Sequence, residues 1–134
     1  MTWENKMVYY INRSIETDFE TAIQRITISL KSEGFAVVTK LDVQEKLNNA
    51  LDVNFRPYMI LGACNPQGAY NALLHENKIG VLLPCNVIVQ DLGDGNIEIA
   101  TVDPYASMMA VENSELGALA GDIKTRLKNA IENA

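Results

Sequence analysis

The two cysteines of the chain are the residues with the widest choice of chemistry, and each is followed by an asparagine, as Cys64-Asn65 and Cys85-Asn86. A thiolate can attack an electrophile, exchange with a disulfide or bind a soft metal. Cys64 also stands just before a predicted helix start, where unpaired backbone N–H groups and the helix dipole favour the thiolate over the thiol. Free cysteine is also among the most buried residue types and often packs as a small hydrophobe. The pair therefore indicates either a thiol site or two packed side chains.

Other polar side chains stand near the ends of predicted strands and could contact a ligand. An arginine in a loop can hold a carboxylate through its guanidinium, whereas the asparagines and the aspartate could equally act as helix caps or turn formers. A methionine near them could line a pocket, although methionine more often fills gaps in a core. The predicted ligand-binding residues are Arg56, Cys64, Asn65, Cys85, Asn86, Asp103 and Met108.

No catalytic or cofactor motif accompanies these residues in the sequence. The single histidine, His75, has no nucleophile elbow beside it, and glycine patterns for phosphate or dinucleotide binding are absent. A zinc site made from Cys64, His75 and Cys85 would spread its ligands along a helix of ~15 Å, although zinc lies only ~2 Å from each ligand. A bend in that helix would restore the site; without one we expect no metal, no cofactor and no catalytic residue.

Composition is typical of a folded protein with one domain over residues 1–134. The chain is 48% hydrophobic and 21% charged, which is too apolar for a disordered segment. Its net charge of −6 opposes binding to a phosphate backbone, so no nucleic-acid partner is expected. No apolar run has the length of a signal peptide or a membrane span. We therefore expect no membrane association and a cytoplasmic location, where the thiols stay reduced.

Local patterns predict alternating strands and helices along the whole chain. Thr17 begins a capping box for the first helix, Asp42 begins a second one, and Asn65-Pro66 is a typical start for a third. Gly117 and Gly121 in the last helix would let it approach the sheet or a second subunit closely. Strands are predicted at 6–13, 35–41, 58–64, 86–90 and 97–102, helices at 18–33, 42–51, 65–75, 104–109 and from 114 onward, and extended chain at 78–84.

Several longer stretches resemble the bacterial and archaeal domain-of-unknown-function family number 302. They are Tyr9-Tyr10, "LKSEGF" at 30–35, "FRPYMILGACNP" at 55–66, "LLPCN" at 82–86, and "VDP" at 102–104 with Met108-Met109. The resemblance extends over about 6–131. It implies an α+β fold of two layers, with a curved, mainly antiparallel sheet, helices on one face, and a β-α-β-β-β-β-α order similar to TATA-box-binding protein. It also implies a dimer, and it brings no established activity.

The arrangement of two strands decides whether the cysteines can act together. If the strand ending at Cys64 and the strand beginning near Cys85 are antiparallel neighbours, as the resemblance implies, both residues lie at one end of the sheet. A parallel crossover would separate them by about 16 Å. We therefore expect a small cytoplasmic homodimer that binds a small molecule or a partner protein without catalysis. The alternative is a thiol-dependent redox or metal-handling protein that uses both cysteines.

Overall fold

The described part of the chain contains five strands, and its strands and α-helices follow the order expected from the sequence. The computed structural model describes residues 8–108, 111 and 113–134. In chain order its elements are β1 (Tyr10–Glu16), α1 (Phe19–Ser32), β2 (Ala36–Asp42), α2 (Val43–Leu51), β3 (Tyr58–Cys64), α3 (Pro66–His75), the 3-10 helix η2 (Ile79–Leu82), β4 (Cys85–Gly93), β5 (Asn96–Val102), α4 (Pro104–Met108) and α5 (Ser114–Asn133).

The strands form one sheet in which every neighbouring pair is antiparallel. Its order is β1-β5-β4-β3-β2, so β3 and β4 lie side by side. Ala63 on β3 pairs with Cys85 on β4, and the next residue, Cys64, pairs with Ala36 on β2. The expected two-layer α+β fold is confirmed, with short helices inserted between the strands. A parallel crossover between the two cysteine-bearing strands is excluded.

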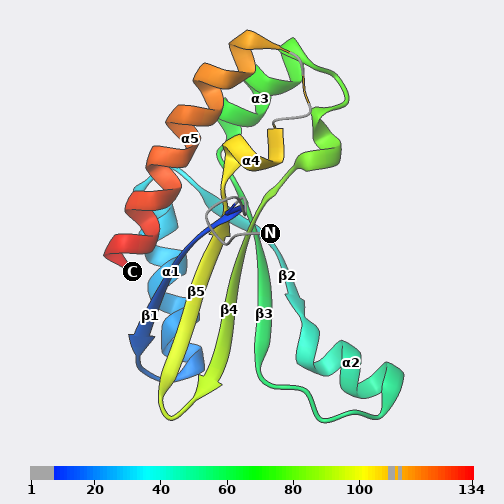
Figure 1. The fold of residues 1–134 in the computed structure, drawn as a ribbon, viewed down its shortest axis with the longest axis vertical. Coiled ribbons are helices and arrows are strands. Elements are labelled where there is room, and N and C mark those ends of the chain that lie inside the picture. Colours follow the sequence, from blue (N-terminus) through cyan, green and yellow to red (C-terminus); the bar gives the residue numbers. More distant parts are fainter. Residues whose placement is uncertain (1–7, 109–110, 112) are drawn as a thin grey trace, which may run out of the picture.

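Helices α1 and α5 cover one face of this sheet, and the other elements gather at its two ends (Figure 1). Buried strand residues such as Leu61, Val87 and Ile99 pack with Leu30 of α1 and Leu127 of α5 in one hydrophobic core. Helices α3 and α4 lie with the first turns of α5 beyond one end of the sheet, and α2 lies beyond the other (Figure 1). The second face of the sheet is left open by the helices that the structure describes.

Polar caps fix most helix boundaries close to their predicted positions. Asn65 and Asp42 accept hydrogen bonds from the backbone N–H groups of Gly68 and Glu45, as expected for the starts of α3 and α2. The cap of α1 differs from the prediction. Asp18, not Thr17, accepts the N–H of Thr21 at 2.8 Å. The backbone N–H of Thr17 instead donates to Gly95 in the β4–β5 turn, which holds this residue outside the helix.

The segment before β4 is extended only at its end, at Leu83 before Pro84, and the expectation of extended chain is wrong for residues 79–82. Residues 79–82 form η2, in which the backbone N–H groups of Ile79 and Val81 donate to the carbonyls of Glu76 and Lys78. The tight turn carries Ile79 into a small buried cluster with Ala72 and Leu116, where it is 1% exposed. Burial of this side chain favours the turn over an extended strand, which would keep the segment at the surface.

The first strand is displaced from its predicted range. It begins at Tyr10 and continues to Glu16, because each of these residues pairs with a residue of β5 between Asn96 and Val102. The predicted start at 6–7 lies outside the described residues. Within the described residues, no helix has both the length and the apolar character needed to cross a bilayer.

Candidate functional site

A cavity lies where α3, η2 and α5 meet the ends of β2, β3 and β4. Its volume is about 370 Å³ and its walls are almost entirely apolar. Of the seven predicted ligand-binding residues, four line it: Cys64, Asn65, Cys85 and Met108. The remaining wall includes Leu119 and Ile123, which are on the buried side of α5.

Small side chains explain why the space is not filled. Ala69 and Ala72 of α3 face the cavity, together with Gly68 and Ala63. Part of the wall belongs to the main core between the sheet and helices α1 and α5. Another part belongs to the smaller cluster around Ala72, Ile79 and Leu116. Two apolar clusters therefore approach each other here without merging, and a ligand could occupy the gap between them.

A close approach between strands at Gly62 shapes the sheet end of the cavity. The pairing of β2 with β3 shifts between Val37 and Thr39, opposite Gly62. A Cβ at Gly62 would collide with Thr39 Oγ1 and would lie 2.8 Å from Pro84 Cγ. Thr39 and Pro84 both line the cavity. The missing side chain of Gly62 thus lets Thr39 and Pro84 approach β3 closely, a role that glycine often has inside a strand.

The two thiols have unequal surroundings within the shared cavity. Both are free, and Cys85 is buried at 9% exposure whereas Cys64 is partly exposed. Burial raises the pKa of the Cys85 thiol to about 11, and the charge of a nearby Cys64 thiolate acts in the same direction. Cys85 is therefore a protonated thiol at neutral pH and a poor nucleophile.

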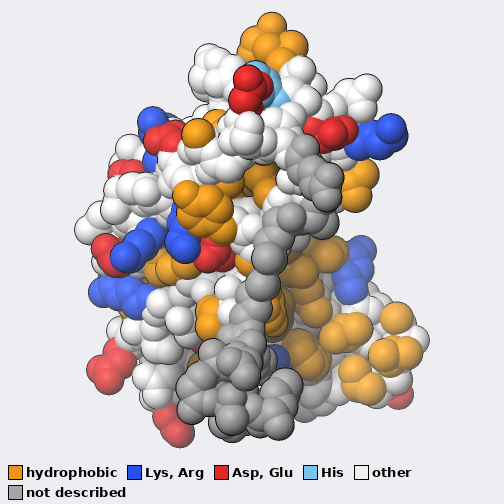
Figure 2. All heavy atoms as spheres, turned by 45° about the horizontal axis from the view of Figure 1, so that its top comes forward, with side chains coloured by type: hydrophobic (Ala, Val, Ile, Leu, Met, Phe, Trp, Pro, Cys, Tyr) orange, Lys and Arg blue, Asp and Glu red, His pale blue; other side chains and the backbone are white. Residues whose placement is uncertain are grey.

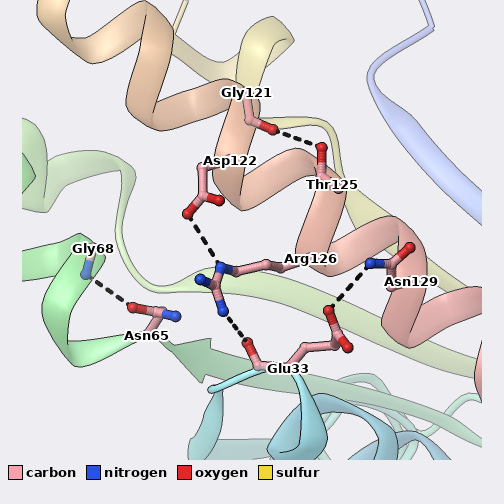
Figure 3. A network of polar contacts seen from close by, with 8 residues as sticks. All are labelled: Glu33, Asn65, Gly68, Gly121, Asp122, Thr125, Arg126 and Asn129. Carbon is pink, nitrogen blue, oxygen red and sulfur yellow. Dashed lines mark hydrogen bonds and ion pairs between the residues drawn. The ribbon is translucent and has the colours of Figure 1, made fainter.

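Asn65 joins the cavity to a polar group that the sequence did not indicate, the guanidinium of Arg126 on α5. Both the Asn65 amide nitrogen and Arg126 Nη1 lie within 4 Å of the point where a Cβ on Gly34 would be. Figure 3 shows Arg126 reaching from α5 toward Asn65 across the chain that follows α1. Arg126 follows Ile123 of the buried stripe by three residues, but nothing local in the sequence signals that α5 passes beside Asn65.

The other three predicted residues lie away from the cavity. Asn86 is exposed on the open face of the sheet, in a shallow depression bordered by Tyr10 and Tyr58. Asp103 borders a separate cavity of about 510 Å³, which Met108 also lines, and its Oδ2 lies 3.0 Å from Lys124 Nζ. The structure therefore separates Asn86 and Asp103 from the cysteines.

Arg56 lies at the opposite end of β3 from Cys64. Its Nε donates to Gln90 Oε1 at 2.8 Å, and its guanidinium carbon lies 4.5 Å from the centre of the Phe55 ring. These contacts hold the guanidinium against the sheet surface, where stacking and a hydrogen bond already engage it. Arg56 is thus part of the open sheet face and not of the cavity.

His75 pairs with the first turn of the last helix. Its Nε2 lies 2.6 Å from Glu115 Oε2, and its backbone carbonyl accepts from Asn113 Nδ2. These contacts connect the end of α3 to the start of α5 and so position two walls of the cavity. Among residues 8–108, 111 and 113–134, no group of three or more His, Cys, Asp or Glu side chains is arranged to hold a metal ion.

Comparison with known proteins is decisive for the family. The model of the family described as "Domain of unknown function DUF302" matches residues 11–134. The chain belongs to the DUF302 family. A crystal structure of an uncharacterized conserved DUF302 protein from Bacillus stearothermophilus is 30% identical, with a TM-score of 0.87, and the match covers 95% of this chain and 98% of that one. No curated protein matches the chain significantly. Membership of DUF302 confirms the resemblance seen in the sequence and brings no activity with it.

Proposed function

We propose that this DUF302 protein binds a small, largely apolar molecule in the cavity at the end of its sheet, without catalysing a reaction. One observation carries the proposal: an apolar space of about 370 Å³ persists between two hydrophobic clusters. Small-molecule sites commonly have volumes of about 300 to 1,000 Å³ and mainly apolar walls. An apolar ligand would complete the packing that alanines and glycines leave open.

The chemistry of the lining favours binding over catalysis. Its titratable side chains, among the described residues, are Cys64 and Cys85. The thiol of Cys85 has a pKa of about 11 and so holds its proton. General acid–base catalysis works best with groups whose pKa is close to the working pH. The cavity is therefore better suited to holding a ligand than to moving a proton.

A cavity-filling variant tests the proposal. Ala69→Phe adds a ring to a residue of α3 that lines the cavity, whereas Ala50→Phe makes the same change at an exposed position of α2. We expect an environment-sensitive apolar dye, such as an anilinonaphthalene sulfonate, to bind the wild type and Ala50→Phe alike. Ala69→Phe should weaken binding by about tenfold or more, because the ring occupies the site.

Fluorescence titration gives the affinities, and circular dichroism checks that each variant keeps its helix content. Equal dye binding by Ala69→Phe and Ala50→Phe would move the ligand site elsewhere. Absence of binding to the wild type across a panel of apolar dyes and solvents would overturn the proposal altogether.

We further propose that the protein is a homodimer in which a second copy covers the open sheet face. Leu41, Ile60 and Ile88 are neighbours in one row across β2, β3 and β4. Hydrophobic side chains gather toward the lower right of Figure 2, on the side where Figure 1 shows β2, β3 and α2. An exposed apolar patch of this kind is typical of protein interfaces.

The polar groups beside that row are already paired, which lowers the cost of covering them. Glu98 accepts hydrogen bonds on both carboxylate oxygens, from Gln90 Nε2 at 2.7 Å and from Asn12 Nδ2 at 3.0 Å. Arg56 donates to the same Gln90 side chain. A second copy could therefore approach without leaving a bare carboxylate in the interface.

A thiol-dependent redox or metal-handling role is the second candidate, and one observation favours it. Cys64 and Cys85 line the same cavity at the same end of the sheet, and the charge of Cys64 contributes to the raised pKa of Cys85, as expected for near neighbours. The buried, protonated state of Cys85 opposes this role. The relative reactivity of the two thiols separates the candidates.

A further inference from the structure

We infer that the ligand of the cavity is an amphipathic monocarboxylate, whose carboxylate is held by Asn65 and Arg126 while its apolar body fills the cavity. This inference rests on the proposed function and specifies its ligand class. It begins at Gly34, beside which two side-chain donors from different elements, Asn65 and Arg126, come together. The Asn65 amide nitrogen is 3.2 Å, and Arg126 Nη1 3.7 Å, from the point that a Cβ at Gly34 would occupy.

Hydrogen bonds already made by Asn65 fix the direction in which its amide points. Its Oδ1 accepts the backbone N–H of Gly68 at 2.9 Å as the cap of α3, so the oxygen faces the helix and the nitrogen faces away. No acceptor for this nitrogen occurs among the described residues. Because α3 needs the oxygen as its cap, the orientation of the amide follows from the fold and leaves two N–H groups for a ligand.

Arg126 also has donor capacity left for a ligand. Its Nε donates to Asp122 Oδ2 at 3.1 Å and its Nη1 to the carbonyl oxygen of Glu33 at 3.3 Å (Figure 3). A guanidinium has five N–H groups, and within the described part of the chain Nη2 has no acceptor. The pair with Asp122 joins exposed residues four apart on one helix, an arrangement that contributes little energy. A carboxylate placed between Arg126 and Asn65 could therefore compete for the guanidinium.

One of these donors lines the apolar space, and the other, Arg126, stands just outside its lining. Asn65 itself lines the cavity, as do Phe35, which follows Gly34, and Ile123, one turn before Arg126 on α5. A molecule that filled the cavity and reached the donors would be apolar over most of its length and polar at one end. The site thus fits a fatty-acid-like or arylalkanoic acid better than a uniformly apolar compound.

Nearby charges favour a single carboxylate over a phosphate. The carboxylate of Asp122 contacts Arg126, and Glu33, whose backbone carbonyl also contacts Arg126, has its carboxylate held by Asn129 Nδ2 at 3.3 Å. A dianion would be repelled by these two carboxylates more strongly than a monoanion. A planar carboxylate also matches the fork of a guanidinium, with which it can form two parallel hydrogen bonds.

Calorimetric titration with octanoate and with 1-octanol tests the inference, because the two differ mainly in the charged end. Asn65→Asp keeps an oxygen to cap α3 but removes the donor, and Arg126→Gln removes the charge. Arg56→Gln makes the same change at the other end of β3, outside the cavity, and serves as control. We expect octanoate to bind the wild type about tenfold more tightly than octanol, since a charge-assisted hydrogen bond contributes on this scale.

Asn65→Asp and Arg126→Gln should each weaken octanoate binding about tenfold and leave octanol binding within about twofold, while Arg56→Gln changes neither. Equal affinity of the wild type for octanoate and octanol would overturn the carboxylate inference and leave the proposed apolar site standing. If Arg126→Gln bound octanoate as tightly as the wild type does, the carboxylate inference would be overturned in the same way. If neither compound binds and Ala69→Phe also leaves dye binding unchanged, the proposed function itself fails.

Discussion

At the scale of single residues, the two thiols differ enough to be told apart by their chemistry. Alkylation requires the thiolate, and Cys85 is buried with a pKa raised to about 11. We expect iodoacetamide at pH 8 to label Cys64 first and Cys85 much more slowly, with the rate at Cys85 rising until about pH 11. Peptide mass spectrometry on the native protein and on the single-thiol variants Cys64→Ser and Cys85→Ser measures both rates.

Equally fast labelling of both cysteines at pH 8 would contradict this expectation and would support the thiol-dependent role.

The raised pKa of Cys85 also has a consequence for the stability of the fold. The folded protein keeps the Cys85 proton up to about pH 11, whereas the unfolded chain loses it near the ordinary value of 9.0. The contribution of this proton to the free energy of unfolding is therefore complete below about pH 9 and is lost as the pH rises toward 11. Urea unfolding of the wild type should show this loss, and Cys85→Ser should lack it.

At the scale of elements, the two glycines of α5 make different demands on their neighbours. A Cβ at Gly121 would lie 2.6 Å from the hydroxyl oxygen of Tyr105 on α4, whereas a Cβ at Gly117 would meet nothing within 4 Å. Within the chain, the element that approaches α5 closely at Gly121 is thus α4, and not the sheet, which was one of the two surfaces expected from the sequence. An added Cβ at Gly121 would therefore displace the end of the half-exposed Tyr105 side chain, whereas one at Gly117 would displace nothing.

Alanine substitutions at these two positions form a matched pair. Gly117→Ala should raise the free energy of unfolding by up to about 1 kcal/mol, because alanine is the better helix former. Gly121→Ala gains the same propensity but must displace the half-exposed hydroxyl end of Tyr105, which offsets part of that gain. We expect Gly121→Ala to be less stable than Gly117→Ala in urea unfolding, and adding Tyr105→Phe should narrow the difference. Equal stability of the two alanine variants would mean that α4 moves aside without cost.

The elements that could be predicted from the sequence are those whose signals are local. Asn65 followed by Pro66 marks the start of α3, and Gly93-Asp94-Gly95 forms the β4–β5 turn, with positive φ at all three residues. The 3-10 helix η2 could not be predicted, because its formation depends on burying Ile79 against Leu116, 37 residues further along the chain. Long-range burial overrides a local preference for extended structure there.

The candidate site was predictable to the same limited extent. Cys64 and Cys85 share a cavity because their strands are antiparallel neighbours, which followed from the family resemblance and not from periodicity. Asn86, although it follows Cys85 directly, points to the opposite face of β4, as alternation along a strand requires. Arg126 is remote in sequence from Asn65, and only the packing of α5 beside α3 brings them together.

At the scale of the whole molecule, the proposed dimer can be tested through the open sheet face. Ile88 lies at the centre of that face, between Ile60 on β3 and Ala100 on β5. Ile28 is 70% exposed on α1, which covers the opposite face. A lysine on the open face would be buried without a partner charge in a dimer formed there, whereas a lysine at Ile28 would stay in water.

We therefore expect the wild type and Ile28→Lys to sediment as dimers in analytical ultracentrifugation and Ile88→Lys to sediment as a monomer. Circular dichroism should be the same for all three proteins, since neither side chain belongs to the main core. A monomeric wild type would contradict the proposed dimer, and a dimeric Ile88→Lys would mean that the dimer forms through a surface other than the open sheet face.

The cavity lies at the end of the sheet on the side of α3 and α5, so Ile88→Lys should bind the apolar dye as the wild type does. If Ile88→Lys lost both dye binding and dimerisation, the second copy would instead help to close the cavity.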